Sequence, residues 1–235
     1  DELEKEGYTL EVTEFTDYVT PNTSLEDGDL DANYFQTLAY LKEQNKERKL
    51  HLKAVAGIHY EAMALYSENL KSLDDLKDGA TIAVPNDGSN ESRALALLAK
   101  NNLIELNDDT LYTASSITAN PHNYKIEELE ADNLPNNLPD VDVAVINGNY
   151  ALEANYTVKK DALAYEKSDS EAAKTYVNVI AVKEGNENSK KIIAANVTPV
   201  TILFPPVLPC SPASRHRDGS IPPISPTNTQ TDCSG

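Results

Sequence analysis

The amino-acid sequence predicts an α/β protein whose sheet strands run in parallel. Strand-like and helix-like segments alternate through residues 1–197, which is typical of this fold class. Residues 80–84 and 141–146 are almost entirely apolar, as expected for strands covered on both faces. Ligands of such folds bind beyond the carboxyl ends of the strands, so the polar residues that directly follow strands are the first candidates for a site.

The predicted elements begin with a strand. Residues 8–15 alternate apolar and polar side chains, which indicates a strand with one buried face. A proline-centred turn follows over 17–22. Residues 30–48 carry apolar side chains at helical spacing and predict an amphipathic helix. Two further strands are predicted over 50–57 and 61–66.

A second set of elements follows a short helix over 73–77, which Ser72 is suited to cap. The strand over 80–84 leads through a polar turn into a strong helix over 91–100. Short apolar or alternating runs predict the remaining strands at 103–106, 124–129, 141–146 and 176–182. Further helices are predicted over 150–154 and 187–194, and the pattern stops at Pro199.

Charge is distributed unevenly along the chain. There are 38 acidic and 20 basic side chains, and the whole net charge of −18 lies within residues 1–197. This excess of acid argues against nucleic acid or an anionic lipid surface as partner, because both require a basic surface. Residues 198–235 are rich in proline and contain Cys210 and Cys233, a pattern unlike the disulfide framework of a large domain.

The sequence contains no familiar catalytic or metal-binding motif. There is no nucleophile elbow, P-loop or dinucleotide-binding glycine loop, and residues 1–197 contain no cysteine. The histidines of this region, His51, His59 and His122, lack the spacing of zinc ligands. We therefore predict no metal site and no cofactor.

Three polar clusters follow predicted strands directly, at 59–60, 85–93 and 147–149. Arg93 is one of only two arginines in residues 1–197, and it lies near the start of a predicted helix, where an anion is favoured. Its guanidinium is suited to bidentate binding of a carboxylate. A salt bridge with a nearby acid such as Glu91 is an equally good interpretation of the same residue.

Other candidates are weaker when taken singly. Four asparagines could bind a polar ligand, although asparagine is also common in turns and caps: Asn86, Asn90, Asn147 and Asn149. Four ring-bearing residues could form an apolar wall, although such residues more often belong to the core: Tyr34, Phe35, His59 and Tyr60.

Several stretches carry a family resemblance. They lie at 15–22, 28–36, 71–87, 90–95, 128–131, 134–135 and 142–151. In this order they resemble the NlpA/MetQ family of lipoproteins, which are the substrate-binding subunits of methionine ABC importers. The resemblance extends from residue 8 to about residue 195 and rests on the combination, since each stretch alone is short.

The resemblance implies a periplasmic-binding-protein-like fold of type II, in which two α/β lobes hold the ligand between them. Residues 1–66 and 175–197 would form one lobe, which lacks the family's first strand, and residues 67–174 would form the other. We expect residues 198–235, where the resemblance has ended, to be a non-native or poorly ordered tail.

The resemblance also implies a function and a site. The protein would bind methionine, a related amino acid or a methionyl peptide, and deliver it to the importer's permease without catalysing a reaction. Arg93 would bind the ligand carboxylate, and the polar end would be held by Asn90, Asn149, Asn147 and Asn86. Tyr34, Phe35, His59 and Tyr60 would line the thioether subsite. The full-length protein would be held to the outside of the membrane by an N-terminal lipid anchor that this chain lacks.

Departures from the family pattern leave two alternatives open. Thr37, Ala62 and Gly88 stand where members often have His, Pro and Pro, which affects the fine shape of the pocket. One alternative is an α/β enzyme acting on an amino acid, with His59 as its general base. The other is a binding-incompetent fragment of the family.

Overall fold

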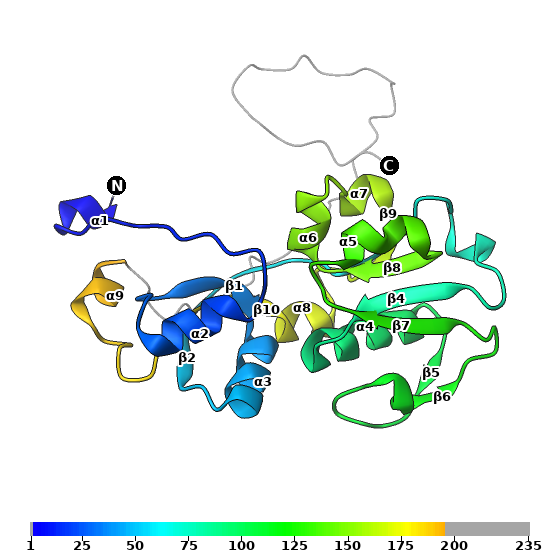
Figure 1. The fold of residues 1–235 in the computed structure, drawn as a ribbon, viewed down its shortest axis with the longest axis horizontal. Helices are drawn as coiled ribbons and strands as arrows, with labels where there is room; N and C mark the ends of the chain where they lie inside the picture. Colours follow the sequence, from blue (N-terminus) through cyan, green and yellow to red (C-terminus); the bar gives the residue numbers. More distant parts are fainter. Residues whose placement is uncertain (1, 196–235) are drawn as a thin grey trace, which may run out of the picture. The chain divides into compact units, whose positions relative to one another are not determined.

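The computed structural model describes residues 2–195 (Figure 1). The predicted tail over 198–235, with both cysteines, lies outside the described residues. Within the described part, the strands form a three-stranded, a five-stranded and a two-stranded sheet. No helix in this part of the chain combines the length and the apolar character needed to cross a membrane.

The five-stranded sheet has the strand order β7-β4-β8-β3-β9. These strands are Lys125–Leu129, Thr81–Pro85, Val143–Ile146, Ala64–Tyr66 and Ala162–Tyr165, respectively. β4 runs parallel to β7 and β8, as predicted, whereas β3 runs antiparallel to β8 and β9. The prediction of a purely parallel sheet is therefore wrong for β3, whereas β9 runs in the same direction as β8 because both are antiparallel to β3. Parallel neighbours need a crossover connection, and β3 is reached directly from the other sheet without a helix.

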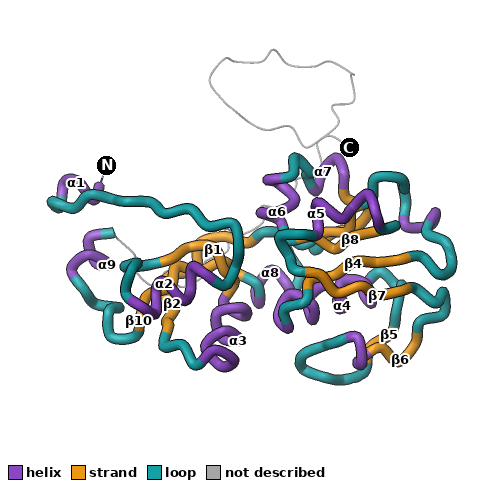
Figure 2. The backbone as a smooth tube through the Cα atoms, in the orientation of Figure 1, coloured by secondary structure: helices purple, strands orange, loops and turns teal. Residues whose placement is uncertain are grey.

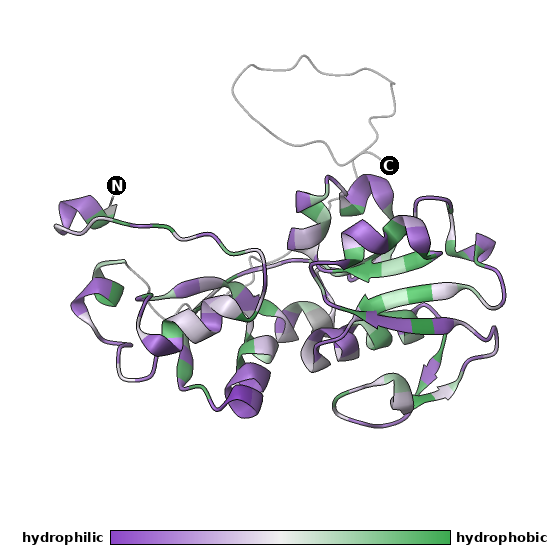
Figure 3. Cartoon of the chain, in the orientation of Figure 1, coloured by the Kyte–Doolittle hydropathy of each residue, from purple (hydrophilic) through white to green (hydrophobic). Residues whose placement is uncertain are grey.

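Both faces of this sheet are covered by apolar side chains, which accounts for the uninterrupted apolar runs. On one face Ile82 and Val84 pack with residues of helix α4, Gly88–Lys100. On the other face Ala83 packs with residues of α5, Leu134–Asn137, and α6, Gly148–Glu153. The alternation along β4 divides its side chains between two cores. β4 and β8 are accordingly drawn as predominantly hydrophobic in Figure 3.

The three-stranded sheet has the order β1-β10-β2 and is antiparallel throughout. Its strands are Asn33–Thr37, Val177–Lys183 and Leu52–Tyr60. Helices α2, Thr20–Asp27, and α3, Leu38–Arg48, contact all three strands. The core beneath them contains Leu25, Leu41, Leu52, Val179 and Ala181. This sheet is joined to the five-stranded one by the chain between β2 and β3 and by the chain between β9 and β10.

Two predictions near the N-terminus are wrong. The predicted helix over 30–48 is divided into β1 and α3, because Thr37 is extended and caps α3 by accepting a hydrogen bond from the N–H of Tyr40 (3.2 Å). The predicted strand over 8–15 is extended but pairs with no strand among residues 2–195, and Leu10 and Val12 are 69% and 74% exposed. Alternation alone does not make a strand when no neighbour supplies hydrogen bonds.

The remaining elements are short (Figure 2). Ser72 caps a 3₁₀ turn over Leu73–Asp75, as predicted, and α2 begins inside the predicted turn over 17–22. The strands over 103–106 and 176–182 are found with slightly different bounds, and the helix over 187–194 begins only at Lys190. The other elements are α1 Glu2–Lys5, β5 Glu105–Leu106, η2 Ala114–Ser116, β6 Ile117–Ala119, η3 Leu138–Asp140, α7 Val158–Asp161, α8 Glu171–Thr175 and α9 Lys190–Ala194.

Candidate functional site

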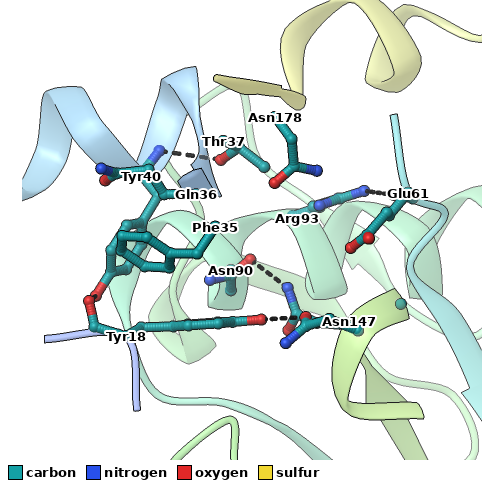
Figure 4. Close-up of a pocket in the computed structure, with 12 residues that line it drawn as sticks. Tyr18, Phe35, Gln36, Thr37, Tyr40, Glu61, Asn90, Arg93, Asn147 and Asn178 are labelled. Carbon is teal, nitrogen blue, oxygen red and sulfur yellow. Dashed lines mark hydrogen bonds between the residues drawn. The ribbon is translucent and has the colours of Figure 1, made fainter. Parts of the chain in front are cut away.

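A pocket of about 340 Å³, including space open to solvent, is lined by residues of the three-stranded sheet and α3 and by residues of α4 and α6, which follow strands of the five-stranded sheet (Figure 4). Its polar wall comes from the starts of α4 and α6, which directly follow the parallel strands β4 and β8. The full lining is Tyr18, Phe35, Gln36, Thr37, Tyr40, Glu61, Asn90, Arg93, Asn147, Gly148, Asn149 and Asn178.

A chain of hydrogen bonds fixes the asparagines of the polar wall. Asp87 caps α4 and accepts from the backbone N–H of Asn90 (2.9 Å) and from its side-chain Nδ2 (2.9 and 3.0 Å). Burial raises the pKa of Asp87, although the hydrogen bonds from Asn90 oppose this shift. The side-chain oxygen of Asn90 in turn accepts from Nδ2 of Asn147 (2.8 Å). Asp87 therefore orients the amide of Asn90, and Asn90 orients the amide of Asn147. Because Nδ2 of Asn147 takes part in this chain of hydrogen bonds, its Oδ1 atom points away from the chain.

Oδ1 of Asn147 is a buried acceptor that has no hydrogen-bond partner in the described part of the chain. Asn147 is 6% exposed and lines the pocket. Buried polar atoms in native proteins are almost always paired, and an exception calls for an explanation. An acceptor of this kind on a pocket wall is suited to a ligand that brings its own N–H donor.

Arg93 is 3% exposed, and its guanidinium is already bound on one edge. Nε donates to Oε1 of Glu166 (2.9 Å) and Nη2 donates to Oε2 of the same carboxylate (2.6 Å). Nη2 also donates to the backbone oxygen of Glu61 (2.8 Å). The salt-bridge interpretation of Arg93 is therefore confirmed, but its example Glu91 is wrong: Glu91 accepts from the N–H of Ala114 (2.9 Å) instead. Glu91 lies only two residues before Arg93 on α4, whereas Glu166 directly follows β9.

Glu166 is as deeply placed as the arginine that it pairs with. It is 4% exposed, and besides Arg93 it accepts from the hydroxyl of Tyr60 (2.7 Å) and the N–H of Met63 (2.9 Å). Burial lowers the pKa of Arg93, but the hydrogen bonds and charge of Glu166 outweigh it, and the net shift is upward. The guanidinium also lies 4.4 Å from the ring centroid of Tyr176. The Nη1 nitrogen forms no hydrogen bond to any residue between 2 and 195.

The apolar wall is an aromatic cluster on the side of β1 and α3. The ring of Tyr18 lies 5.7 Å from those of Phe35 and Tyr40 and 4.7 Å from that of Tyr150. The Tyr18 hydroxyl donates to Oδ1 of Asn149, so this ring also contacts the polar wall. Burial raises the pKa of Tyr18 well above its ordinary value, which keeps the hydroxyl protonated as a donor.

Four predicted site residues lie away from the pocket wall. Asn86 is exposed, and the Tyr60 hydroxyl is bound to Glu166. Tyr34 forms a hydrogen bond with Nδ1 of His59, whose Nε2 lies 2.9 Å from a carboxylate oxygen of Glu61. Of the four predicted ring-bearing residues, only Phe35 lines the pocket. The pairing of β1 is irregular between Tyr34 and Gln36, and Tyr34 is 48% exposed, whereas Phe35 lines the pocket.

Sequence reasoning did not select the other lining residues as site candidates: Tyr18, Gln36, Tyr40, Glu61, Gly148 and Asn178. Thr37, noted above as a departure from the family pattern, also lines the pocket. Tyr18 lies within the stretch 15–22 that carries the family resemblance, and this was the available signal. Residues 2–195 contain no cluster of three or more His, Cys, Asp or Glu side chains placed to hold a metal ion.

Comparison with known proteins gives consistent results. The family described as NlpA lipoprotein matches residues 1–197. The D-methionine-binding lipoprotein MetQ of Salmonella typhi is 45% identical over 199 residues, which cover 82% of this chain and 72% of the relative. The corresponding protein of Escherichia coli (strain K12) is 44% identical with the same coverage.

Solved structures agree with these relatives. A nutrient-binding protein from Burkholderia cenocepacia bound to methionine superimposes with a TM-score of 0.78 at 43% identity, over 82% of this chain and 80% of that one. A periplasmic substrate-binding protein of an ABC transporter from Coxiella burnetii gives 0.77 at 41% identity, over 83% and 82%. The chain therefore has the mixed α/β fold of substrate-binding proteins, as the sequence predicted.

Proposed function

The chain belongs to the NlpA lipoprotein family, and from this premise we propose that it is the solute-binding protein of an ABC importer and that it binds methionine. The observation that carries the proposal is the pocket itself. It places a paired arginine and an unpaired amide oxygen opposite an aromatic wall. A methionine zwitterion has matching parts: an anion, a cation and an apolar thioether.

The proposed binding mode follows from the polar atoms of the pocket that have no hydrogen-bond partner in the described part of the chain. The ligand carboxylate accepts from Nη1 of Arg93, and the ligand ammonium donates to Oδ1 of Asn147. The thioether lies against the rings of Tyr18, Phe35 and Tyr40, because sulfur makes favourable contacts with aromatic rings. Asn90 and Asn149 act indirectly, by holding Asn147 and Tyr18 in place.

We propose that the two larger sheets form two lobes around this ligand. One lobe contains the three-stranded sheet with α2 and α3, and the other contains the five-stranded sheet with α4, α5 and α6. We propose the boundary between the lobes before Ala64 rather than after residue 66, a choice supported by the pairing of β3 with β8 and β9. Ligand binding between the lobes would couple occupancy to closure and hence to recognition by the permease.

The relatives also support a place of action and a partner. They are named as lipoproteins and as periplasmic substrate-binding proteins, so this protein would act outside the cytoplasm, held to the membrane by lipid, and pass its ligand to an ABC permease. An enzyme that uses His59 as general base is less well supported. Both ring nitrogens of His59 are already hydrogen-bonded, and the side chain does not line the pocket.

Isothermal titration calorimetry of protein freed of ligand tests the proposal. We expect one site per chain for L-methionine or D-methionine. A protein that gives no heat with methionine or methionyl peptides, yet binds an unrelated solute, would contradict the proposed ligand. Turnover of methionine in a product assay, abolished in His59→Ala, would instead favour the enzyme.

A further inference from the structure

We infer that Glu166 is a positioning residue that holds and neutralises Arg93, and that the pocket consequently selects its ligand more by the ammonium group than by the carboxylate. The inference rests on the proposed function, because it specifies which end of an amino acid that pocket recognises. It concerns the ligands accepted, and it is separable by experiment from methionine binding itself.

The geometry of Arg93 limits how a ligand carboxylate can bind. Bidentate capture of a carboxylate by arginine uses two parallel N–H groups on one edge of the guanidinium. On Arg93 the edge formed by Nε and Nη2 is occupied by the two oxygens of Glu166, at 2.9 and 2.6 Å. The remaining bond of Nη2 goes to the backbone of Glu61. A ligand carboxylate therefore meets only the Nη1 side, where a neutral carbonyl oxygen could accept the hydrogen bond almost as well.

The second step concerns charge. Glu166 is buried with Arg93, so the pair brings no net charge to the pocket. The pocket also contains Glu61, whose Oε1 atom faces His59 and whose Oε2 atom lies beside Gly148. A Cβ at Gly148 would lie 3.0 Å from Cβ of Glu61, so the glycine lets this carboxylate approach the start of α6 closely. Glu61 has His59, and neither Arg nor Lys, as its partner among the described residues, so its carboxylate favours a cation at this end of the pocket.

The third step concerns hydrogen bonding. Oδ1 of Asn147, a buried acceptor on the pocket wall without a partner in the described chain, belongs to the residue that precedes Gly148 in the same wall. The Asn147 amide cannot flip to present its Nδ2 donor at this place, because Nδ2 donates to Oδ1 of Asn90. An ammonium group satisfies this acceptor and the charge of Glu61 together, whereas a carboxylate at this end would face two acceptors. A ligand without the ammonium group should therefore lose more affinity than a ligand without the carboxylate.

Two analogues of methionine of nearly the same shape test the inference on the unmodified protein. Methionine amide keeps the ammonium and lacks the carboxylate charge, and the 2-hydroxy analogue of methionine keeps the carboxylate and lacks the ammonium. By calorimetry we expect the amide to bind about tenfold more weakly than methionine, and the hydroxy analogue about a hundredfold more weakly or worse. A protein that binds methionine but prefers the hydroxy analogue to the amide overturns this inference alone. Failure to bind methionine contradicts the proposed function instead.

Variants of Glu166 test the positioning role. In Glu166→Gln the guanidinium becomes an uncompensated cation, so the ratio of the amide Kd to the methionine Kd should rise by about tenfold or more. Glu166→Asp retains the charge and should return the ratio toward that of the unmodified protein. Glu43→Gln, which alters a carboxyl that contacts Ser89 and not Arg93, should leave the ratio unchanged. An unchanged ratio in a folded Glu166→Gln protein contradicts the role, and if that variant does not fold the analogue pair still decides.

Discussion

The two walls of the pocket are built by different physical means. The polar wall depends on directional bonds, in which Asp87, Asn90 and Asn147 orient one another and Glu166 orients Arg93. The aromatic wall depends on ring packing among Tyr18, Phe35 and Tyr40, with one hydroxyl linking it to the polar side. The comparison shows where specificity comes from. Removing a hydrogen bond in the polar wall leaves a buried polar group without a partner, whereas shortening a side chain of the aromatic wall only reduces the apolar contact area.

The largest expected effect is that of Arg93→Met. The change leaves the buried carboxylate of Glu166 without its cation, so we expect the free energy of unfolding to fall by about 3–5 kcal/mol and methionine binding to be lost. Chemical denaturation and calorimetry measure the two effects. Arg48→Met is the control at an exposed arginine whose Nε donates to Oε1 of the neutral Gln44 (2.7 Å), and a comparable loss there would contradict the account.

A smaller effect is expected for Asn147→Ala. It removes the acceptor proposed for the ligand ammonium, so affinity for methionine should fall by about 1–3 kcal/mol. The free energy of unfolding should also fall by about 1–3 kcal/mol, because the change leaves the buried Oδ1 of Asn90 without the Nδ2 donor of Asn147. Asn86→Ala, at an exposed asparagine outside the pocket, should bind methionine normally. Equal affinities for the two variants would show that the acceptor does not contact the ligand.

A change in the aromatic wall should lower the affinity for methionine without changing which analogue is preferred. Phe35→Leu trims ring contacts at the proposed thioether site, and we expect affinity for methionine to fall by about 1 kcal/mol. The preference for methionine amide over the hydroxy analogue should persist, because no charged group is altered. Tyr34→Leu, the neighbour that points away from the pocket, should change affinity less. A reversal of the analogue preference in Phe35→Leu would mean that the two walls do not act separately.

The smallest predicted effect is a pH dependence at the contact between α3 and α4. Burial raises the pKa of Glu43 to about 7, opposed by the hydrogen bond from Ser89 and reinforced by the charges of Asp87, Glu47 and Glu91. Between its ordinary value of 4.5 and 7, the native state binds more protons than the unfolded state, so stability falls as pH rises through this window. Since Glu43 is only half-buried, we expect its share to be about 1–2 kcal/mol.

Denaturation of the unmodified protein and of Glu43→Gln at pH 5 and pH 8 measures this share. The variant should lose less stability than the unmodified protein between the two values. Identical losses would show that another group, such as Glu91, whose pKa burial also raises to about 7, is responsible for the whole dependence.

The sequence predicted the five-stranded region better than the three-stranded one, for a physical reason. The apolar runs of β4 and β8 and the helix after β4 are complete local patterns, so neither depends on distant residues. In β1 and α3 the apolar spacing continues across the junction at Thr37, and a helix was predicted over both. The prediction of a strand over 8–15 is wrong because a strand needs a neighbouring strand to pair with. The alternation of apolar and polar residues does not show whether such a neighbour exists.

The same limit applies to the site. Asn90, Arg93, Asn147 and Asn149 could be selected because each follows a strand, and the structure brings them together. Glu166 could not be selected, since it is 73 residues from Arg93 and no local pattern joins them. His59 and Tyr34 were selected by type, but the direction of side chains along β1 and β2 depends on register.

A crystal structure of the protein with bound methionine would test the central claim most directly. The account predicts methionine in the pocket of Figure 4, with its carboxylate on Nη1 of Arg93, its ammonium on Oδ1 of Asn147, and Glu166 still paired with the arginine. Methionine bound outside this pocket would contradict the account, as would a carboxylate that replaces Glu166 on the Nε and Nη2 edge.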